Sequence, residues 1–157
     1  MSSEIQPASN LSVSPLSFGI VAARYNRELT DSLLDRIISS LTENGEPENL
    51  TVERVPGTNE IPSALSLLLE AGKYSCMIGI GVVIKGATSH HHLVAESAGN
   101  GIQSLALKHN IPIINGIIVT DNLEDAAERI TGRLDRGNEF AQAAIEMGHL
   151  YKKWTKT

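Results

Sequence analysis

Short apolar runs alternate with amphipathic stretches along most of the chain, and this alternation predicts its secondary structure. Apolar residues recur at helical spacing from Leu29 to Leu41, and Asn44-Gly45 closes the helix they predict. The continuous apolar run over residues 76–84 is typical of a strand covered on both faces. In chain order, the predicted strands are residues 18–23, 50–55, 76–84 and 111–119, and the predicted helices are residues 29–41, 61–71, 90–108, 122–131 and 135–152.

The order of these elements predicts the fold class. Strands that alternate with helices favour a mainly parallel four-stranded sheet with helices on both faces, joined by right-handed crossovers. We therefore expect one α/β domain over residues 17–157, a three-layer αβα sandwich. Residues 1–16 are rich in Ser, Pro and Asn without a helical period, so they predict a flexible arm or a tail docked on a neighbouring chain.

Composition and charge exclude some classes of protein and some binding partners. Apolar residues make up 41% of the chain and charged residues 20%, as in an ordinary globular domain. The net charge of −5 disfavours broad binding to nucleic acid or to a membrane surface, because both require a basic face. The single cysteine, Cys76, cannot form an internal disulfide. With no apolar stretch of membrane-spanning length and no secretory signal, we expect a cytoplasmic protein.

The parallel sheet also predicts where the chemistry lies. Ligands of such sheets bind beyond the carboxyl ends of the strands, in turns that here include residues 24–26, 56–60, 85–90 and 119–121. The turn Gly86-Ala87-Thr88-Ser89 precedes a long helix, whose free backbone N–H groups and positive end suit a phosphate. A plain capped turn is the alternative. A P-loop is excluded because Ala87 stands where its lysine is required, and the glycine spacing also misses the dinucleotide pattern.

The run His90-His91-His92 begins the helix that follows this turn. Successive helical residues point about 100° apart, so the three imidazoles cannot converge on one metal ion. A single histidine beside an anion site is a better candidate for proton transfer, because its pKa lies near working pH. An ordinary surface histidine is the alternative.

Two charged side chains each leave two interpretations open. Glu60 either complements a helix dipole or accepts hydrogen bonds from substrate hydroxyls. Arg129 belongs either to a solvated helix face or to a phosphate site, since a guanidinium is the favoured partner of a phosphate.

These turns, in this order, resemble those of lumazine synthases across about residues 17–150. Each stretch alone is weak, but five or more in the correct order are highly specific. The matching stretches are Ala23-Arg24-Tyr25-Asn26, Val55-Pro56-Gly57 with Glu60-Ile61-Pro62, Val83 through His90, Ile111-Pro112-Ile113 to Gly116, Thr120-Asp121, Glu128-Arg129, and Ala144 through Met147.

The resemblance implies a flavodoxin-like subunit and a homo-oligomer, with active sites between adjacent subunits of a pentamer. In many members twelve pentamers form a hollow 60-subunit shell. The implied reaction condenses 5-amino-6-(D-ribitylamino)uracil with 3,4-dihydroxy-2-butanone 4-phosphate to 6,7-dimethyl-8-ribityllumazine, the penultimate step of riboflavin biosynthesis. No metal or organic cofactor is implied.

For the pyrimidine, the resemblance implies three groups of residues. Tyr25 is the aromatic residue that stacks on the ring. The segment that holds the ring and the ribityl chain consists of Thr58, Asn59 and Glu60. The strand end that lines the pocket consists of Val82, Val83 and Ile84.

For the sugar phosphate, the resemblance implies that Gly86, Ala87 and Thr88 form the phosphate loop. Arg129 is implied to bind the same phosphate from the adjacent subunit, and His90 to be the catalytic histidine. Arg136 falls where the family usually has a lysine in the site.

Some positions depart from the family pattern. Asn59 and Asn115, both implied pocket positions, stand where many members have phenylalanine, and this makes the pocket more polar. His91, His92 and Leu93 replace aromatic and acidic residues. The alternative is therefore a paralogue that binds lumazine or flavin, or forms a shell, without synthase activity.

Overall fold

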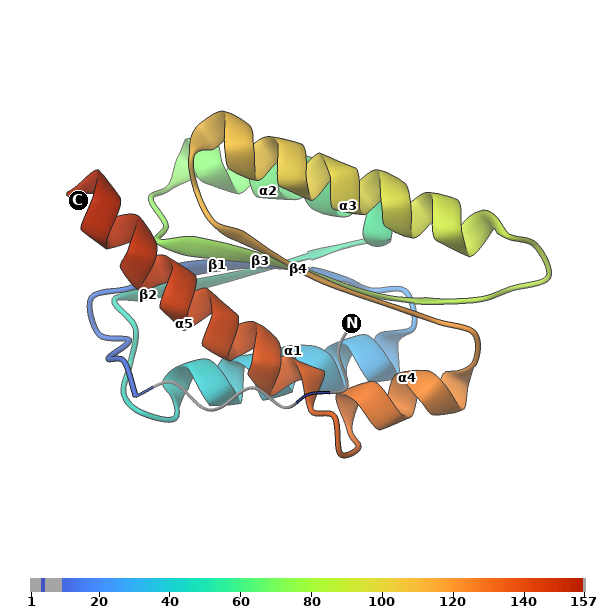
Figure 1. Cartoon of the computed structure of the whole chain (residues 1–157). Helices are drawn as coiled ribbons and strands as arrows, with labels where there is room; N and C mark the ends of the chain where they lie inside the picture. The colour runs from blue at the N-terminus through green and yellow to red at the C-terminus, as the bar shows by residue number, and fades with distance from the viewer. Residues whose placement is uncertain (1–3, 5–9, 157) are drawn as a thin grey trace.

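The computed structural model describes residue 4 and residues 10–156, and it shows four strands and six helical segments within them (Figure 1). The elements are β1 (Ser17–Ala23), α1 (Arg27–Thr42), β2 (Asn49–Val55), η1 (Thr58–Glu60), α2 (Ile61–Ala71), β3 (Cys76–Ile84), α3 (His90–His109), β4 (Ile113–Thr120), α4 (Leu123–Ile130) and α5 (Arg136–Thr155). Every predicted strand and helix is present, and the short 3-10 helix η1 is an addition.

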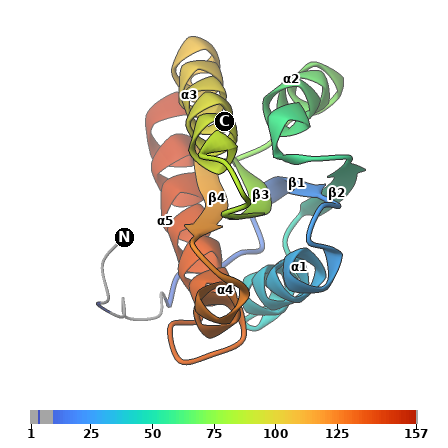
Figure 2. The same cartoon turned by 90° about the vertical axis from the view of Figure 1, so that its right-hand side faces the viewer.

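The sheet has the order β2-β1-β3-β4, and all its pairs are parallel. Helices α2 and α3 cover one face, while α1, α4 and α5 cover the other, as the two views of Figures 1 and 2 agree. The predicted α/β class is therefore confirmed, and the arrangement is flavodoxin-like. Because Ala23 pairs with Val55, and Ile84 with Thr120, all four strands end at one edge of the sheet.

Strand alternation divides the core into two apolar layers. On β1, Phe18 and Ile20 point toward α1 and α5, whereas Val21 and Ala23 point toward α2 and α3. Each of these side chains is fully buried. Cys76 also lies in the α1–α5 layer, where burial raises the pKa of its thiol. This cysteine is thus a protonated core residue. Among the residues that the structure describes, no helix is long and apolar enough to cross a membrane.

Two glycines let β3 approach the overlying helices closely. A Cβ atom at Gly79 would lie 2.7 Å from the side chain of Ile61, and one at Gly81 would lie 2.6 Å from Oγ1 of Thr58. Any larger residue would displace η1 and the start of α2. The glycines of this apolar run therefore set the position of η1 over the sheet.

Part of the predicted arm packs against the domain. Val13 and Leu16 are buried in the α1–α5 layer, and the carbonyl of Leu16 accepts a hydrogen bond from the N–H of Glu48 at 2.8 Å. Residues 1–3 and 5–9 of the arm lie outside the described residues, and the arm's docking on a neighbouring chain stays a prediction.

One ion pair joins α1 to the residue that precedes α5, and it gives the stability of the fold a pH dependence. The guanidinium of Arg36 donates two hydrogen bonds, of 2.8 and 2.7 Å, to the carboxylate of Asp135. This contact holds the pKa of Asp135 below its ordinary value. A lowered carboxyl pKa stabilises the fold above the unfolded pKa of about 3.9, and that stabilisation is lost as pH falls through the folded pKa.

We expect Asp135→Asn to lower the free energy of unfolding by about 1 kcal/mol or less at pH 7, because both partners are more than a third exposed and solvent screens the pair. Asparagine retains an acceptor for the N–H of Asn138 and tolerates the left-handed backbone at this position (φ 45°), so the change isolates the charge. Urea unfolding at pH 7 and pH 3 measures the effect. The difference in the free energy of unfolding between the variant and the native protein should shrink at pH 3. An unchanged difference would show that the charge of Asp135 does not cause the effect.

Candidate active site

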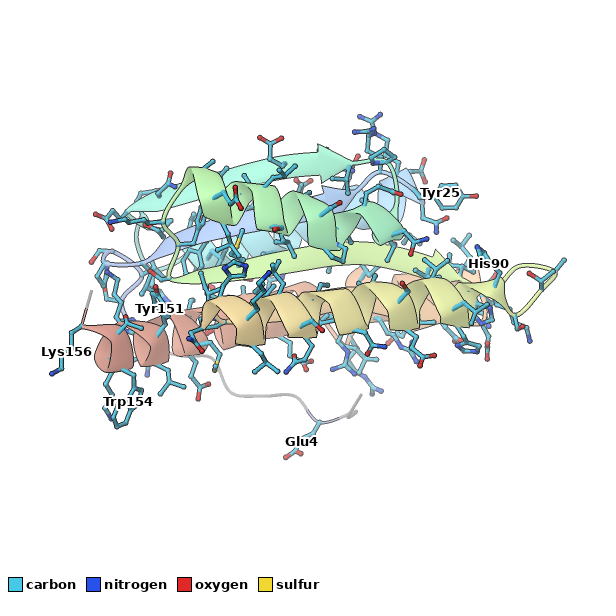
Figure 3. All side chains as sticks on the ribbon, turned by 90° about the horizontal axis from the view of Figure 1, so that it is seen from above. Glu4, Tyr25, His90, Tyr151, Trp154 and Lys156 are labelled. Atoms are coloured by element: carbon cyan, nitrogen blue, oxygen red, sulfur yellow. The ribbon has the colours of Figure 1, made fainter. Side chains whose placement is uncertain are left out.

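A cleft of about 400 Å³ opens at the carboxyl edge of the sheet. This volume is in the range of small-molecule pockets. Its walls come from the turns after β1, β2 and β3 and from the first turn of α3. The lining residues are Tyr25, Asn26, Gly57, Thr58, Asn59, Glu60, Val82, Val83, Ile84, Gly86, Thr88, His90, His91 and Val94. Figure 3 shows Tyr25 and His90 at this same end of the molecule, near the end of β3.

The turn after β1 fixes the backbone of Tyr25 and leaves its ring free. Asn26 adopts a left-handed conformation (φ 55°), and its side-chain amide donates a 2.7 Å hydrogen bond to the carbonyl of Val82 on β3. The hydroxyl of Thr30 donates to the carbonyl of Tyr25 at 2.9 Å. The Tyr25 ring is nevertheless 74% exposed at the mouth of the cleft. An aromatic face held in this way is suited to stack on a planar ligand.

The segment η1 forms the second wall. Thr58 is buried against Gly81, while Asn59 and Glu60 are exposed. Glu60 is the N-cap residue of α2, but its side chain makes no capping hydrogen bond to that helix. Glu60 also lines the cleft, and one of its carboxylate oxygens lies next to Gly57.

The loop after β3 contains backbone N–H groups that no other group of the described residues satisfies. The N–H of Lys85 still donates to the carbonyl of Thr120, at 2.9 Å, but those of Gly86, Ala87 and Thr88 have no hydrogen-bond partner among the described residues. The space around Gly86 is open. The 20-residue helix α3 begins just beyond, at His90, without a side-chain cap from Ser89. Unsatisfied N–H groups and the positive helix end make this loop suitable for an anion.

The three consecutive histidines lie in three different environments. His90 is exposed and lines the cleft, His91 is buried and also lines it, and His92 is exposed outside it. The described residues contain no group of three His, Cys, Asp or Glu side chains able to hold a metal ion.

The structure brings ten of the fourteen expected site residues into one cleft and leaves four outside its lining. Ala87 belongs to the loop without lining the cleft. Asn115 is exposed on the edge strand β4, where its side-chain oxygen accepts a hydrogen bond from the N–H of Ile117 at 3.0 Å. Arg129 donates to the carbonyl of Val119 at 2.9 Å, and Arg136 is buried in an ion pair with Glu139.

Four cleft residues were not expected to be site residues: Asn26, Gly57, His91 and Val94. His91 had a signal in the sequence, because Ala98 and Ile102 follow it at i+7 and i+11, the spacing of a single buried helix face. Asn26 could have been identified as the left-handed residue that ends a strand-to-helix turn, since asparagine tolerates this conformation.

A parallel four-stranded sheet between two layers of helices defines a protein of the flavodoxin-like class, and the exposed aromatic ring, the carboxylate and the helix N-terminus at its carboxyl edge make a candidate small-molecule site. A model of the 6,7-dimethyl-8-ribityllumazine synthase family matches residues 15–152 of the 157-residue chain. The chain therefore belongs to the lumazine synthase family, which acts in riboflavin biosynthesis.

Proposed function

We propose that the protein is an active lumazine synthase, a transferase that condenses 5-amino-6-(D-ribitylamino)uracil with 3,4-dihydroxy-2-butanone 4-phosphate to give 6,7-dimethyl-8-ribityllumazine. The supporting observation is that an exposed tyrosine, a glutamate and the glycine loop ahead of α3 line one cleft. These are the groups that a planar pyrimidine with a polyol chain and a phosphate ester require.

The two substrates occupy different walls. The pyrimidine ring stacks on Tyr25 and lies against Val82 and Val83, and its ribityl hydroxyls reach Glu60. The sugar phosphate lies across the cleft with its phosphate on the Gly86–Thr88 loop. His90, next to that loop, then lies between the phosphate and the reacting carbons.

The reaction requires proton transfers but no external electrons. The 5-amino group attacks the ketone, and loss of water gives an imine. Loss of a proton next to the imine expels inorganic phosphate, and the ribitylamino nitrogen then closes the second ring with loss of another water. His90 takes up and returns these protons. Holding both reactants in one cleft supplies most of the acceleration, because intramolecular organisation is worth about 7–11 kcal/mol.

The site is completed by a second copy of the chain. Arg129, Asn115 and Arg136 lie outside the cleft of their own subunit. The strand β4 is a free sheet edge in the single chain, and next to it lies an apolar groove of about 460 Å³ that includes Leu107, exposed by 69%, and Trp154, exposed by 74%. Edges and apolar grooves of this kind are normally covered. A neighbour at this edge brings its Arg129 toward the phosphate loop, in a pentamer or a shell of pentamers.

The second candidate is a paralogue that binds lumazine or flavin without making it. Asn59, which lines the cleft as an exposed amide, favours this alternative because it provides no second aromatic surface for the ring. We favour the synthase over a lumazine-binding paralogue because the open anion loop and His90 would have no role in binding lumazine, which carries no phosphate.

Purified protein incubated with the two substrates tests the proposal. A lumazine synthase produces fluorescent 6,7-dimethyl-8-ribityllumazine and one equivalent of inorganic phosphate per turnover. Binding of added lumazine without formation of new lumazine would identify the paralogue instead.

A further inference from the structure

Arg54, near the carboxyl end of β2, is a charged side chain that the proposed chemistry does not use. It pairs in register with Ala22, whose side chain lies in the α1–α5 layer, so the guanidinium points toward α1. There its Nη1 group donates a 2.6 Å hydrogen bond to the carboxylate of Asp31, and its Nη2 group donates a 3.3 Å hydrogen bond to the carbonyl of Ala23. One guanidinium therefore connects β2, the end of β1 and α1.

The two acceptors of this guanidinium lie on either side of the turn that carries Tyr25. Ala23 is the last residue of β1, before the turn, and Asp31 lies in the first part of α1, after it. Thr30, the neighbour of Asp31, donates its hydroxyl to the carbonyl of Tyr25 at 2.9 Å. Because the Tyr25 ring is mostly exposed and packs against little protein, the backbone of this turn decides where the ring lies.

The pair between Arg54 and Asp31 differs from an ordinary surface ion pair. The Arg54 side chain is 27% exposed, and its planar fork spans two acceptors on different elements. Arg27 contacts the same carboxylate at 3.4 Å, but it is 76% exposed and lies on the same helix, one turn away. The hydrogen bond from Arg54 is the main reason that the pKa of Asp31 lies below its ordinary value. Arg54, rather than Arg27, is thus the principal partner of Asp31.

We propose that Arg54 is a positioning residue for the pyrimidine: it holds both ends of the turn that carries Tyr25 and so strengthens stacking without contacting the substrate. This inference rests on the proposed function, in which Tyr25 stacks on the pyrimidine ring. A turn with more freedom must be ordered when the pyrimidine binds, and this ordering lowers affinity. Among the described residues, Arg54 does not line the cleft and makes no hydrogen bond to the Gly86–Thr88 loop, so the phosphate site should not respond.

The variant Arg54→Met tests the proposal, because methionine keeps a long apolar stem and removes the guanidinium. We expect the Kd for 5-amino-6-(D-ribitylamino)uracil, measured by calorimetry without the second substrate, to rise about three- to tenfold, as for one lost hydrogen bond. The KM for the sugar phosphate and the turnover number at saturating substrates should stay close to the native values, because Arg54 contacts neither the phosphate loop nor His90.

A double-mutant cycle with Tyr25→Ala shows whether Arg54 acts through the ring. Alone, Tyr25→Ala should weaken pyrimidine binding, because the stacking surface is lost. Adding Arg54→Met to Tyr25→Ala should weaken binding no further, since the turn no longer carries the ring. A general loosening of the fold would instead weaken binding by the same factor in both backgrounds.

Further variants make the result specific. Arg27→Met removes the exposed arginine from the same carboxylate and should bind the pyrimidine like the native protein. Arg54→Lys keeps the charge, but one ammonium lacks the fork that spans both acceptors, so it should recover only part of the affinity lost in Arg54→Met. If Arg54→Met does not fold, Asp31→Asn, which removes the charge of the other partner, should raise the same Kd.

The outcomes separate this inference from the proposed function. A native pyrimidine Kd in folded Arg54→Met, or an equal loss with and without the Tyr25 ring, would overturn the role of Arg54 and leave the synthase assignment intact. An equal rise in the KM for the sugar phosphate would also overturn it. Unchanged pyrimidine binding in Tyr25→Ala would contradict the stacking on which the inference rests, and a native protein that does not bind the pyrimidine would overturn both the inference and the proposed function.

Discussion

We expect His90→Ala to lower the turnover number by about 10²–10⁴-fold, the usual contribution of a positioned general acid or base, and to leave a measurable rate. The variant should keep some activity because the groups that bind the two substrates do not depend on His90. Tyr25, Glu60 and the Gly86–Thr88 loop all remain in the cleft, so both reactants are still held together after the imidazole is removed. Single-turnover assays with saturating substrates measure the chemical step directly.

The matched control for this prediction is His92→Ala. His92 is the same residue type two positions along the chain, but it is exposed and lies outside the cleft lining, so its removal should leave turnover close to the native value. A loss beyond about 10⁵-fold in His90→Ala would mean that proton transfer, rather than positioning, dominates catalysis. No loss at all would remove His90 from the mechanism.

We expect Arg129→Ala to raise the KM for the sugar phosphate by about 30-fold or more, since truncating one partner of a buried charge pair costs about 2–5 kcal/mol. The KM for the pyrimidine should change little, because Arg129 does not line the wall assigned to that substrate. Steady-state kinetics with each substrate varied in turn measure this selectivity.

Arg133→Ala is the control for Arg129→Ala, because Arg133 is an exposed arginine four residues further along the chain. Similar KM values in the two variants would show that the general positive charge of this region, rather than a specific contact, attracts the phosphate. Loss of assembly in Arg129→Ala, measured by sedimentation, would assign the residue to the interface instead.

Hydrophobic periodicity predicted the core of this fold well and its irregular parts poorly. The run 76–84 specified β3 to the residue, because a strand buried on both faces is apolar throughout. The predicted start of β4 at residue 111 was wrong by two residues: Pro112 has no N–H, and the N–H of Ile111 bonds back to the carbonyl of Ala106 to close α3. The helix η1 was missed because three residues are too few to show a period.

The sequence likewise predicted some of the site residues and missed others. The rule that parallel sheets bind ligands at their carboxyl edge predicted the place of Tyr25, Glu60 and His90, and the structure brings all three to one cleft. His91 was missed because a run of histidines directs attention to metal and proton chemistry, whereas the apolar face of α3 decides which of them is buried. In the proposed assembly, Arg129 binds a phosphate held by a neighbouring subunit, and no pattern within one chain specifies where a second copy is placed.

We propose that one subunit contributes His90 and the phosphate loop while its neighbour contributes Arg129. Mixing equal amounts of the His90→Ala and Arg129→Ala proteins, after dissociation and reassembly, tests this claim directly. If sites are shared, about one quarter of them pair an intact His90 with an intact Arg129. At a sugar-phosphate concentration below the native KM, where both variants alone have little activity, the mixture should therefore regain about a quarter of native activity. Activity that stays at the mean of the two separate variants would show that each chain builds its own site and would contradict the account.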